Sequence, residues 1–565
     1  MKETRLITSA LPYINNVPHL GHIVGSHLPA DIFARYCRAK GYETLFVGGT
    51  DENGSTSEIA ADEIGIPIDI FSEKLYREHK KVYDWFNISY DNFSRTSNSI
   101  HHKTTQNFFK KIYENGYIKE GKIKVFYSSE EKKFLPDRYV RGICPKCGYK
   151  NASGDQCEKC TSIFDSTQLI DPRSAITNKP VEIKEAIHLF LKLSKLSKKL
   201  EKWIKEKKNW RTQVTSLALG WIKEGLKDRC ITRDLKHGVK VPLKGFEDKV
   251  FYVWFDAPIG YISSTKEASK NWEKFWKDKN TKIYHFLGKD NIPFHTIFWP
   301  GMLIANGNFN LPYYVEGLQY LNYEGGKFSK SQKRGIFCEK LPETKIESDI
   351  LRAYLTFIIP ESADSEFKWK DFQLRINSDI IGNFGNFINR TLTFIYNKLN
   401  KKIKRPLEKE LTELDKNFIK ITKEKFSNIE NYLEKVQLRN AFLEILALSS
   451  IGNKYFNDNE PWKLVNTDAK RTNHVLYLCA GLCKTLSILI QPFLPSTSQK
   501  IWEQLNLEYT PNKKGIWNSA HELNLPDNHT INKPSILFNK LTNDYLEKFK
   551  KHVSNTKSLK EFFED

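Results

Sequence analysis

The sequence predicts an α/β protein that begins with a doubly wound parallel sheet and ends in an all-helical part. Two observations support this prediction. An order of apolar strand, polar loop and helix appears at the start of the chain and then repeats. From about Asn377 onward, apolar residues recur with the period of a helix, and strand signals nearly vanish.

The first strand is predicted at residues 6–10, which we expect to be buried, and a turn-rich stretch follows at 12–18. A helical pattern starts at about Leu20. The order recurs at 44–54 and again at 283–291, where an apolar strand runs into a polar loop. Ligands of doubly wound sheets bind at the carboxyl ends of the strands. We therefore expect a Rossmann-type sheet whose three polar loops line the functional site.

An insertion is predicted to split this sheet between about residues 116 and 241. The pattern there changes to short strands, a cysteine-rich patch and a lysine-rich stretch at 183–227 that we expect to be helical. In the second part of the chain, the clearest predicted helices are 392–399, 442–451 and 475–494. The amphipathic tail, 539–565, is expected to dock as a helix.

Composition excludes a mainly disordered chain, because 40% of the 565 residues are hydrophobic. The 88 basic and 67 acidic residues give a net charge of +21. This excess favours a nucleic-acid partner over a membrane lipid, but solvated surface lysines explain it equally well. No run of ~18 apolar residues indicates a membrane span, and the N-terminus does not resemble a secretory signal. Nine cysteines, four of them in CxxC pairs, indicate thiols in a reducing compartment. We expect a soluble cytoplasmic protein.

The most specific isolated motif is a pair of CxxC turns formed by Cys144, Cys147, Cys157 and Cys160. Four thiolates at this spacing can bind one tetrahedral Zn²⁺, and a site closed by four sulfurs is structural rather than catalytic. Unrelated buried thiols or a redox CxxC are weaker alternatives. The sequence therefore predicts a zinc knuckle.

Two further motifs are unremarkable singly. His19-Leu20-Gly21-His22 lies where the first loop meets the first helix, and imidazoles at a helix N-terminus can donate hydrogen bonds to phosphate. Far downstream, Lys327 and Lys330 lie in the glycine-led stretch Gly-Gly-Lys-Phe-Ser-Lys-Ser. Such a loop can close over a triphosphate and stabilise charge that develops at phosphorus.

Together, HLGH and KFSKS resemble the signature pair of class I aminoacyl-tRNA synthetases. The stretches ALPY at 10–13, YVWFDAPIGY at 252–261, GKD at 288–290 and FH at 294–295 resemble the methionyl-tRNA synthetases within that class. The resemblance runs from about Ile7 to at least Trp462. It implies a ligase that activates L-methionine with Mg²⁺-ATP and transfers it to tRNA(Met).

The resemblance also implies roles for single residues. His19, Gly21 and His22 would bind ATP together with Lys327 and Lys330, and the histidines and lysines would assist catalysis. Asp51 and the backbone of Leu11 would meet the methionine amine. The methionine side chain would be enclosed by Leu11, Tyr13, Trp254, Ala257, Pro258, Tyr261 and His295. Anticodon contacts would come from Asn386, Arg390 and Trp462. Core packing is the alternative for Trp254, Tyr261 and Trp462.

The chain also departs from the family pattern. Residues 171–175 lack the second pair of CxxC turns that the family often has, so one zinc is expected. Phe328 and His237 replace a Met and a Trp of the family. The chain ends at Asp565, before the C-terminal tRNA-binding and dimerisation domain of some members, and a monomer is expected. The predicted divisions are 1–115 and 241–325 (split catalytic domain), 116–240 (zinc insertion), 326–385 (KFSKS loop and stem contact), 386–535 (helical anticodon domain) and 536–565 (tail).

Two rival functions remain. A synthetase for leucine, isoleucine or valine would need a large editing insertion that residues 116–241 do not accommodate, and a cysteine enzyme is a further variant of this rival. A non-catalytic zinc-knuckle RNA-binding protein would need neither HLGH nor KFSKS.

Overall fold

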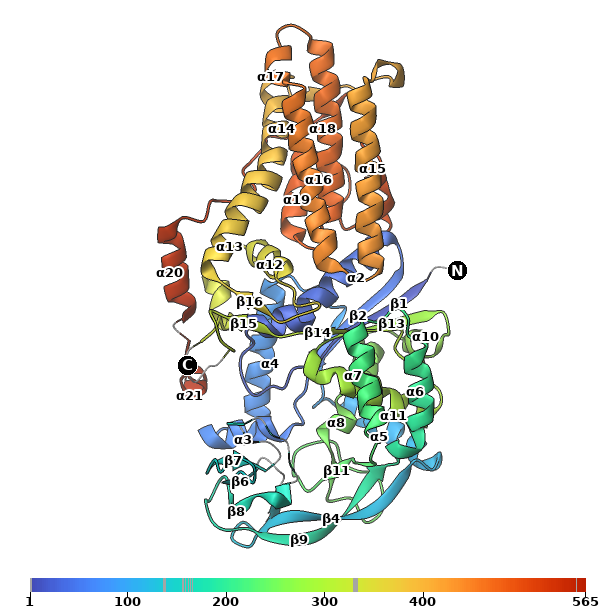
Figure 1. Ribbon diagram of the computed structural model, residues 1–565, viewed down its shortest axis with the longest axis vertical. Helices are drawn as coiled ribbons and strands as arrows, with labels where there is room; N and C mark the ends of the chain where they lie inside the picture. The colour runs from blue at the N-terminus through green and yellow to red at the C-terminus, as the bar shows by residue number, and fades with distance from the viewer. Residues whose placement is uncertain are drawn as a thin grey trace.

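The computed structural model describes residues 3–135, 139–154, 157, 159–160, 162, 164, 166–328, 334–554 and 556–564. Figure 1 shows an elongated molecule with a helical bundle at one end, a sheet with helices in the middle and a strand-rich insertion at the other end. This arrangement confirms the predicted class, an α/β domain followed by an all-helical part.

The central sheet is fully parallel and has the order β14-β13-β1-β2-β3. Its strands are β1 (Thr4–Ser9), β2 (Glu43–Thr50), β3 (Asn92–Arg95), β13 (Thr281–Gly288) and β14 (Tyr314–Leu318). The strand order reverses between β1 and β13, which makes this point the topological switch of the sheet. A ligand crevice is therefore expected beside Ser9 and Gly288, at the ends of these two strands.

Both faces of the sheet are covered, as the continuous apolar character of its strands requires. Phe46 on β2 packs in one apolar core with α2 (Leu28–Lys40), whereas its neighbours Leu45 and Val47 pack in a second core with α9 (Ile259–Ala268). The helix after β1 is not uniform. A single turn, α1 (Leu20–His22), leads into the π-helical η1 (Ile23–His27) and then into α2.

The insertion is built on the long antiparallel pair β4 (Ile118–Ser128) and β9 (Glu182–Leu191), seen at the bottom of Figure 1. The predicted helix at 183–227 is wrong in its first part, because β9 occupies it. Ten residues of β9 pair with β4, and residues 185–188 alternate between exposed and buried with the period of a strand. The remainder is helical in α6 (Ser197–Lys205) and α7 (Thr212–Lys223).

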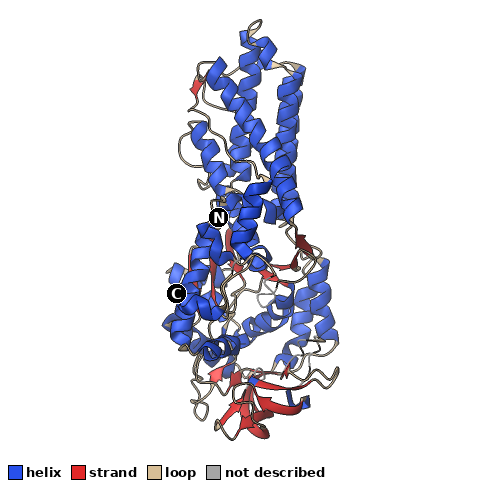
Figure 2. Cartoon of the chain, turned by 90° about the vertical axis from the view of Figure 1, so that its left-hand side faces the viewer, coloured by secondary structure: helices blue, strands red, loops and turns tan. Residues whose placement is uncertain are grey.

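The smaller strands of the insertion form two groups. β5 (Lys133–Leu135) and β10 (Arg229–Cys230) extend the sheet of β4 and β9, and β11 (Thr232–Arg233) pairs with β12 (Val250–Phe251). The cysteine turns lie on a separate sheet of β6 (Val140–Ile143), β7 (Ala152–Ser153) and β8 (Ile170–Ser174). Figure 2 shows the strands of the insertion gathered at the end opposite the bundle.

The helical part begins with a continuous helical stretch formed by α13 (Trp369–Arg375), π-helical η8 (Ile376–Gly385) and α14 (Asn386–Lys398). The bundle also contains α15 (Glu413–Glu434), α16 (Leu438–Asp458), α18 (Ala469–Ile490) and α19 (Pro495–Gln504). Of the described helices, α18 alone is long and apolar enough to cross a membrane, and 94% of its most apolar window is buried inside the protein. It is the core helix of the bundle.

The tail folds back onto the rest of the molecule as two helices, α20 (Asn543–Ser554) and α21 (Leu559–Glu564). Phe549 of α20 packs edge-on against Trp369, with 5.6 Å between ring centroids. Phe563 of α21 stacks on Phe71 of α4 (Ile68–Trp85) at 5.1 Å. The expectation of a docked helical tail is confirmed.

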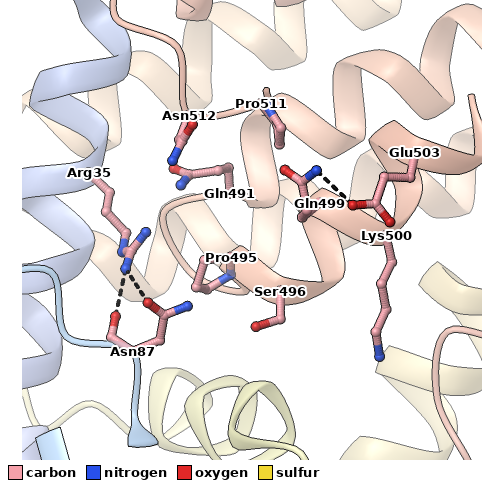
Figure 3. Close-up of a pocket in the computed structure, with 10 residues that line it drawn as sticks. All are labelled: Arg35, Asn87, Gln491, Pro495, Ser496, Gln499, Lys500, Glu503, Pro511 and Asn512. Atoms are coloured by element: carbon pink, nitrogen blue, oxygen red, sulfur yellow. Dashed lines mark hydrogen bonds between the residues drawn. The ribbon is translucent and has the colours of Figure 1, made fainter. Parts of the chain in front are cut away.

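A buried arginine joins the sheet domain to the bundle. Arg352, on α12 (Ser348–Phe357), pairs with Asp31 at 2.8 Å and donates to the backbone carbonyls of Phe86, Pro492 and Phe493. A cavity of about 380 Å³ lies at the same junction. Figure 3 shows Arg35 of α2 and Asn87 facing residues of the α18–α19 region and of the segment after α19, and none of the residues predicted to bind substrate is among the ten that line the cavity.

Candidate active site

The HLGH residues cap the helix that follows β1. Nδ1 of His19 accepts a hydrogen bond from the backbone N–H of Gly21 at 3.0 Å, and Nδ1 of His22 accepts from the N–H of His19 at 3.1 Å. Each Nδ1 is therefore unprotonated and each neutral ring carries its proton on Nε2. Burial lowers the pKa of His19 to about 4, and burial together with His19 holds the pKa of His22 well below its usual value. The pair offers two neutral Nε2–H donors at the switch point.

The structure brings the second motif onto the first. The ring of Phe328 stacks on His19 with 4.7 Å between centroids, and Phe337, beyond the loop, meets His19 edge-on at 5.9 Å. The N–H of Leu20 also bonds to the carbonyl of Ile336 at 3.2 Å. Lys327 is exposed, with its Nζ 5.6 Å from the ring of Tyr320. Lys330, the other predicted lysine, lies outside the described residues.

Asp51 lies at the end of β2 and is buried. Its backbone N–H bonds to the carbonyl of Pro12 and its carbonyl accepts from the N–H of Ile14, so that it is held against the first loop. Within the described part of the chain, Oδ1 of Asp51 has no hydrogen-bond partner. Burial and the neighbouring Asp256 raise the pKa of Asp51 well above its usual value. A carboxylate in this situation fits a cationic ligand, because a cation would supply both the missing charge and the missing donor.

An aromatic enclosure lies beside this carboxylate. The hydroxyl of Tyr261 and Nε2 of His295 are 2.8 Å apart, and Nδ1 of His295 is 3.1 Å from the carbonyl of Asn291. The carbonyl can only accept, so His295 donates from Nδ1 and accepts from Tyr261 at Nε2. Leu11 lies against Gly260, where a Cβ would come within 2.9 Å of its Cδ2.

The remaining predicted pocket residues differ in exposure. Trp254 and Tyr13 are 39% and 42% exposed, so core packing does not account for Trp254. Pro258 and Tyr261 are buried and Ala257 is partly buried. Trp254 meets Phe294, the neighbour of His295, edge-on at 6.0 Å. The predicted methionine-binding residues thus come from the first loop, from the residue after β2, from residues 254–261 after β12, and from η6 (Phe294–Phe298) after β13.

Sequence reasoning missed the polar cluster behind Asp51. Nδ2 of Asn53 donates to Oδ2 of Asp256 at 2.6 Å, and Nε2 of His101 lies 3.5 Å from the same carboxylate. All three side chains are buried. Asp256 lies inside the stretch YVWFDAPIGY, and an acid in so apolar a segment was the available signal. His101 had none.

The four predicted zinc ligands meet in one cluster. Sγ of Cys144 lies 3.8 Å from Sγ of Cys160, Sγ of Cys147 lies 3.6 Å from Sγ of Cys157, and all four atoms are within 4.8 Å of one another. Zn–S bonds of about 2.3 Å in a tetrahedron place the sulfurs about 3.8 Å apart, so the cluster fits Zn²⁺. Across the described residues, it is the only group of three or more His, Cys, Asp or Glu side chains with this geometry.

At the far end of the bundle, the guanidinium of Arg390 lies 4.0 Å from the ring centroid of Phe456 and 6.0 Å from that of Trp462. Trp462 is 43% exposed, so it is not a core residue. Asn386, one turn before Arg390 on α14, is exposed as well. An exposed aromatic ring beside an arginine is a surface on which an unpaired base can stack.

Comparison with known proteins decides the family. A family model described as "tRNA synthetases class I (M)" matches residues 5–392, and one described as "Anticodon binding domain of methionyl tRNA ligase" matches residues 406–558. The chain is 43% identical over 574 residues to a methionine–tRNA ligase of Borreliella burgdorferi, covering 99% of the chain and 75% of that protein. The chain belongs to the methionine–tRNA ligase family.

One member of the methionine–tRNA ligase family matches over nearly its whole length. Methionine–tRNA ligase 1 of Acaryochloris marina is 41% identical over 553 residues, covering 96% of the chain and 98% of that protein. Among solved structures, the fold resembles Mycobacterium tuberculosis methionyl-tRNA synthetase in complex with methionyl-adenylate, with a TM-score of 0.78. That match is 24% identical and covers 95% of this chain and 100% of the other, and it supports the fold alone.

Proposed function

We propose that the residues assembled at the switch point activate L-methionine and that the bundle reads tRNA(Met). The observation that carries the proposal is the stacking of Phe328 on His19. It brings HLGH and the start of KFSKS together at the carboxyl edge of the sheet, the edge at which the buried Asp51 follows β2. The chain is then a methionine–tRNA ligase in which one crevice holds both ATP and methionine.

In the first step, a carboxylate oxygen of methionine attacks the α-phosphorus of ATP. The bond from that phosphorus to the bridging oxygen breaks, and pyrophosphate leaves with its Mg²⁺. The neutral Nε2–H groups of His19 and His22 would donate to phosphate oxygens, and Lys327 and Lys330 would stabilise the charge on the leaving group. No covalent bond to the protein is needed, so position and electrostatics supply the catalysis.

In the second step, a ribose hydroxyl at the 3′ end of tRNA attacks the carbonyl carbon of methionyl-adenylate, and AMP leaves. As the chain resembles class I enzymes, we propose the 2′-hydroxyl. Asn386, Arg390 and Trp462 would contact the CAU anticodon at the opposite end of the molecule. The basic excess of the chain suits such an extended polyanion.

The methionine side chain would lie between Leu11, Trp254 and Tyr261. One methylene in an apolar pocket changes affinity by only ~1–3 kcal/mol, so burial alone does not reject shorter aliphatic residues. Aromatic walls add favourable contacts with a thioether that an aliphatic chain does not make. The residues beneath this pocket, Asn53, His101 and Asp256, would orient Asp51 toward the methionine ammonium.

We also propose one structural zinc in the cysteine cluster and a cytoplasmic location. The four thiolates would hold the knuckle closed, which stabilises the fold of the insertion. The cytoplasmic proposal is supported by the name of one relative, a cytoplasmic methionine–tRNA ligase of Xenopus laevis that is 41% identical over 554 residues.

The test is ATP–pyrophosphate exchange by the purified protein with methionine, leucine, isoleucine, valine and cysteine in parallel. Exchange driven by methionine alone is expected. Exchange driven by leucine, isoleucine, valine or cysteine in place of methionine would assign the enzyme to a different amino acid, and no exchange with any of the five would favour an RNA-binding protein without catalysis. Charging of tRNA(Met) with labelled methionine then tests the second step.

A further inference from the structure

A chain of buried hydrogen bonds runs behind the HLGH helix. It begins at Ser9, the last residue of β1, whose hydroxyl lies 2.6 Å from the phenol oxygen of Tyr90. The same phenol oxygen lies 2.6 Å from Nδ1 of His27 on η1. On the other side of that ring, Nε2 of His27 lies 3.0 Å from the phenol oxygen of Tyr83 on α4.

From Tyr83 the hydrogen bonds continue to the loop between β1 and α1, residues 10–19. The Tyr83 oxygen lies 3.2 Å from Nδ1 of His79, one turn earlier on α4, and Nε2 of His79 lies 2.8 Å from the backbone carbonyl of Asn16. We call Ser9, Tyr90, His27, Tyr83, His79 and Asn16 the loop relay. It joins the strand before the loop, the loop itself and the helix after the loop.

The last bond determines the direction of all the others. A backbone carbonyl can only accept, so His79 donates from Nε2 and its Nδ1 accepts from the hydroxyl of Tyr83. The Tyr83 oxygen must then accept from Nε2–H of His27, whose Nδ1 accepts from Tyr90, and Tyr90 accepts from Ser9. This direction holds for neutral rings, the state that burial favours. Both imidazoles are then protonated at Nε2, and each ring nitrogen and hydroxyl between Ser9 and Asn16 has a partner.

Burial keeps both rings in this state. His27, His79 and Tyr83 are each 1% exposed. Burial lowers the pKa of His79 to about 4, and burial together with His79 lowers the pKa of His27 to about 3. A buried network of this kind is rigid when complete, because each group that loses its partner is left unsatisfied in a medium of low dielectric.

The loop relay holds a different part of the loop from the other backbone contacts. The front of the loop is attached to Asp51 through Pro12 and Ile14, and its end is attached through the carbonyl of Pro18 to the N–H of Cys338 at 2.8 Å. Asn16 lies between these attachments, three residues before His19. The relay therefore supports the half of the loop that leads into the ATP site rather than the half that forms the methionine pocket.

We propose that the loop relay positions His19 and His22 for ATP, with His27, His79 and Tyr83 as positioning residues that do not touch substrate. This inference rests on the proposed activation of methionine by ATP. Its distinguishing consequence is selectivity: interrupting the relay impairs the use of ATP and leaves the apparent affinity for methionine unchanged.

The test compares four variants in ATP–pyrophosphate exchange. Tyr83→Phe removes one oxygen from the middle of the relay and keeps the ring, which lies 4.3 Å from that of His27. His79→Leu removes both hydrogen bonds at the end of the relay. His79→Gln restores them, because an amide carries a donor and an acceptor side by side, as the neutral imidazole does. Tyr76→Phe is the matched control, since on the same helix it loses a hydroxyl bonded to the carbonyl of Phe93 at 2.9 Å.

We expect Tyr83→Phe and His79→Leu to lower kcat/KM for ATP at least tenfold, with KM for methionine within twofold of wild type. His79→Gln should return to within threefold of wild type, and Tyr76→Phe should match wild type. Kinetics of Tyr83→Phe equal to those of Tyr76→Phe would overturn the proposal. So would a failure of His79→Gln to rescue, or an equal rise in KM for methionine, which would indicate general loosening.

A second measurement separates this proposal from the proposed function. In protein labelled with ¹⁵N-histidine, the ring nitrogens of His27 and His79 should show the neutral Nε2–H form at pH 6–8, with assignment from His27→Gln and His79→Gln. This result needs no turnover, so wild-type protein that fails in exchange would refute the activity while leaving the relay testable. A protonated ring or an Nδ1–H form at His79 would refute the relay.

Discussion

Asp51→Asn tests whether the buried carboxylate at the end of β2 binds the methionine ammonium. The substitution preserves shape and volume and removes one negative charge. Asp51 is 3% exposed and, among the described residues, its Oδ1 has no hydrogen-bond partner. Its charge is therefore poorly screened and free to act on a ligand.

The expected loss of methionine affinity follows from the burial of the ion pair between Asp51 and the methionine ammonium. Truncating one partner of a buried, hydrogen-bonded charge pair costs 2–5 kcal/mol or more, and each 1.36 kcal/mol is a factor of ten. KM for methionine should therefore rise by roughly 30-fold to several thousand-fold in methionine-dependent exchange. KM for ATP should stay close to wild type, because Asp51 is placed at the methionine side of the crevice.

The pH dependence gives a second readout. The pKa of Asp51 is raised by burial and by Asp256. In wild type, acidification should therefore protonate Asp51 and raise KM for methionine, and this dependence should be absent in the Asn variant.

The pH dependence of folding stability has the opposite sign: ionised Asp51 favours methionine binding but disfavours the folded state. A carboxyl whose pKa is higher in the folded than in the unfolded state loses folding free energy as pH rises from the unfolded value, ~3.9, toward the folded one. The ligand-free Asn variant should therefore be at least as stable as wild type at pH 7.

Asp349→Asn is the matched control. Asp349 is also fully buried with a raised pKa, but its Oδ2 accepts from the backbone N–H of Thr497 at 2.6 Å and from the hydroxyl of Thr497 at 2.7 Å. Its replacement should leave KM for methionine unchanged. A KM for methionine in Asp51→Asn within threefold of wild type would refute the role of Asp51 in ammonium binding.

Three further substitutions test the remaining sites. Lys330→Ala should lower the rate of activation at least tenfold while methionine still binds, as measured by pre-steady-state exchange and equilibrium dialysis; an unchanged rate removes Lys330 from the mechanism. Trp462→Ala should leave exchange intact and impair charging of tRNA(Met) by about 1–3 kcal/mol, the usual value of a stacked base, whereas equal losses in both assays would assign it to packing. Arg352→Met should lower the free energy of unfolding by about 3–5 kcal/mol, because Asp31 keeps only Arg35 as a charged partner and three buried backbone carbonyls lose their donor; urea denaturation that matches wild type would contradict this.

Local patterns in the sequence carried much of the prediction. The strand–loop–helix order near Leu6 and Leu20 depends on neighbouring residues only, and the spacing of the cysteine turns is equally local. The structure confirms both predictions, with the parallel sheet and with the cluster of four sulfurs. The pairing of HLGH with KFSKS, and the resemblance that it supported, also needed no coordinates, and the comparisons confirmed the family.

Contacts between segments that are distant in the chain could not be predicted from the sequence. Residues 183–191 open the lysine-rich stretch that we expected to be helical, yet they form β9 because β4, far away in the chain, supplies its hydrogen bonds. The raised pKa of Asp51 depends on burial and on Asp256, a neighbour brought close only by folding.

The sequence by itself thus determined the fold class, the family and the chemical character of the site, because these follow from short motifs and from the period of apolar residues. Only the tertiary structure decided which side chains share a buried space. The hydrogen bonds from Ser9 to Asn16 through Tyr83 and His79 illustrate this. Exclusion of water strengthens these bonds and keeps the histidine rings neutral, and water is excluded only after β1, α4 and the loop between β1 and α1 have packed together.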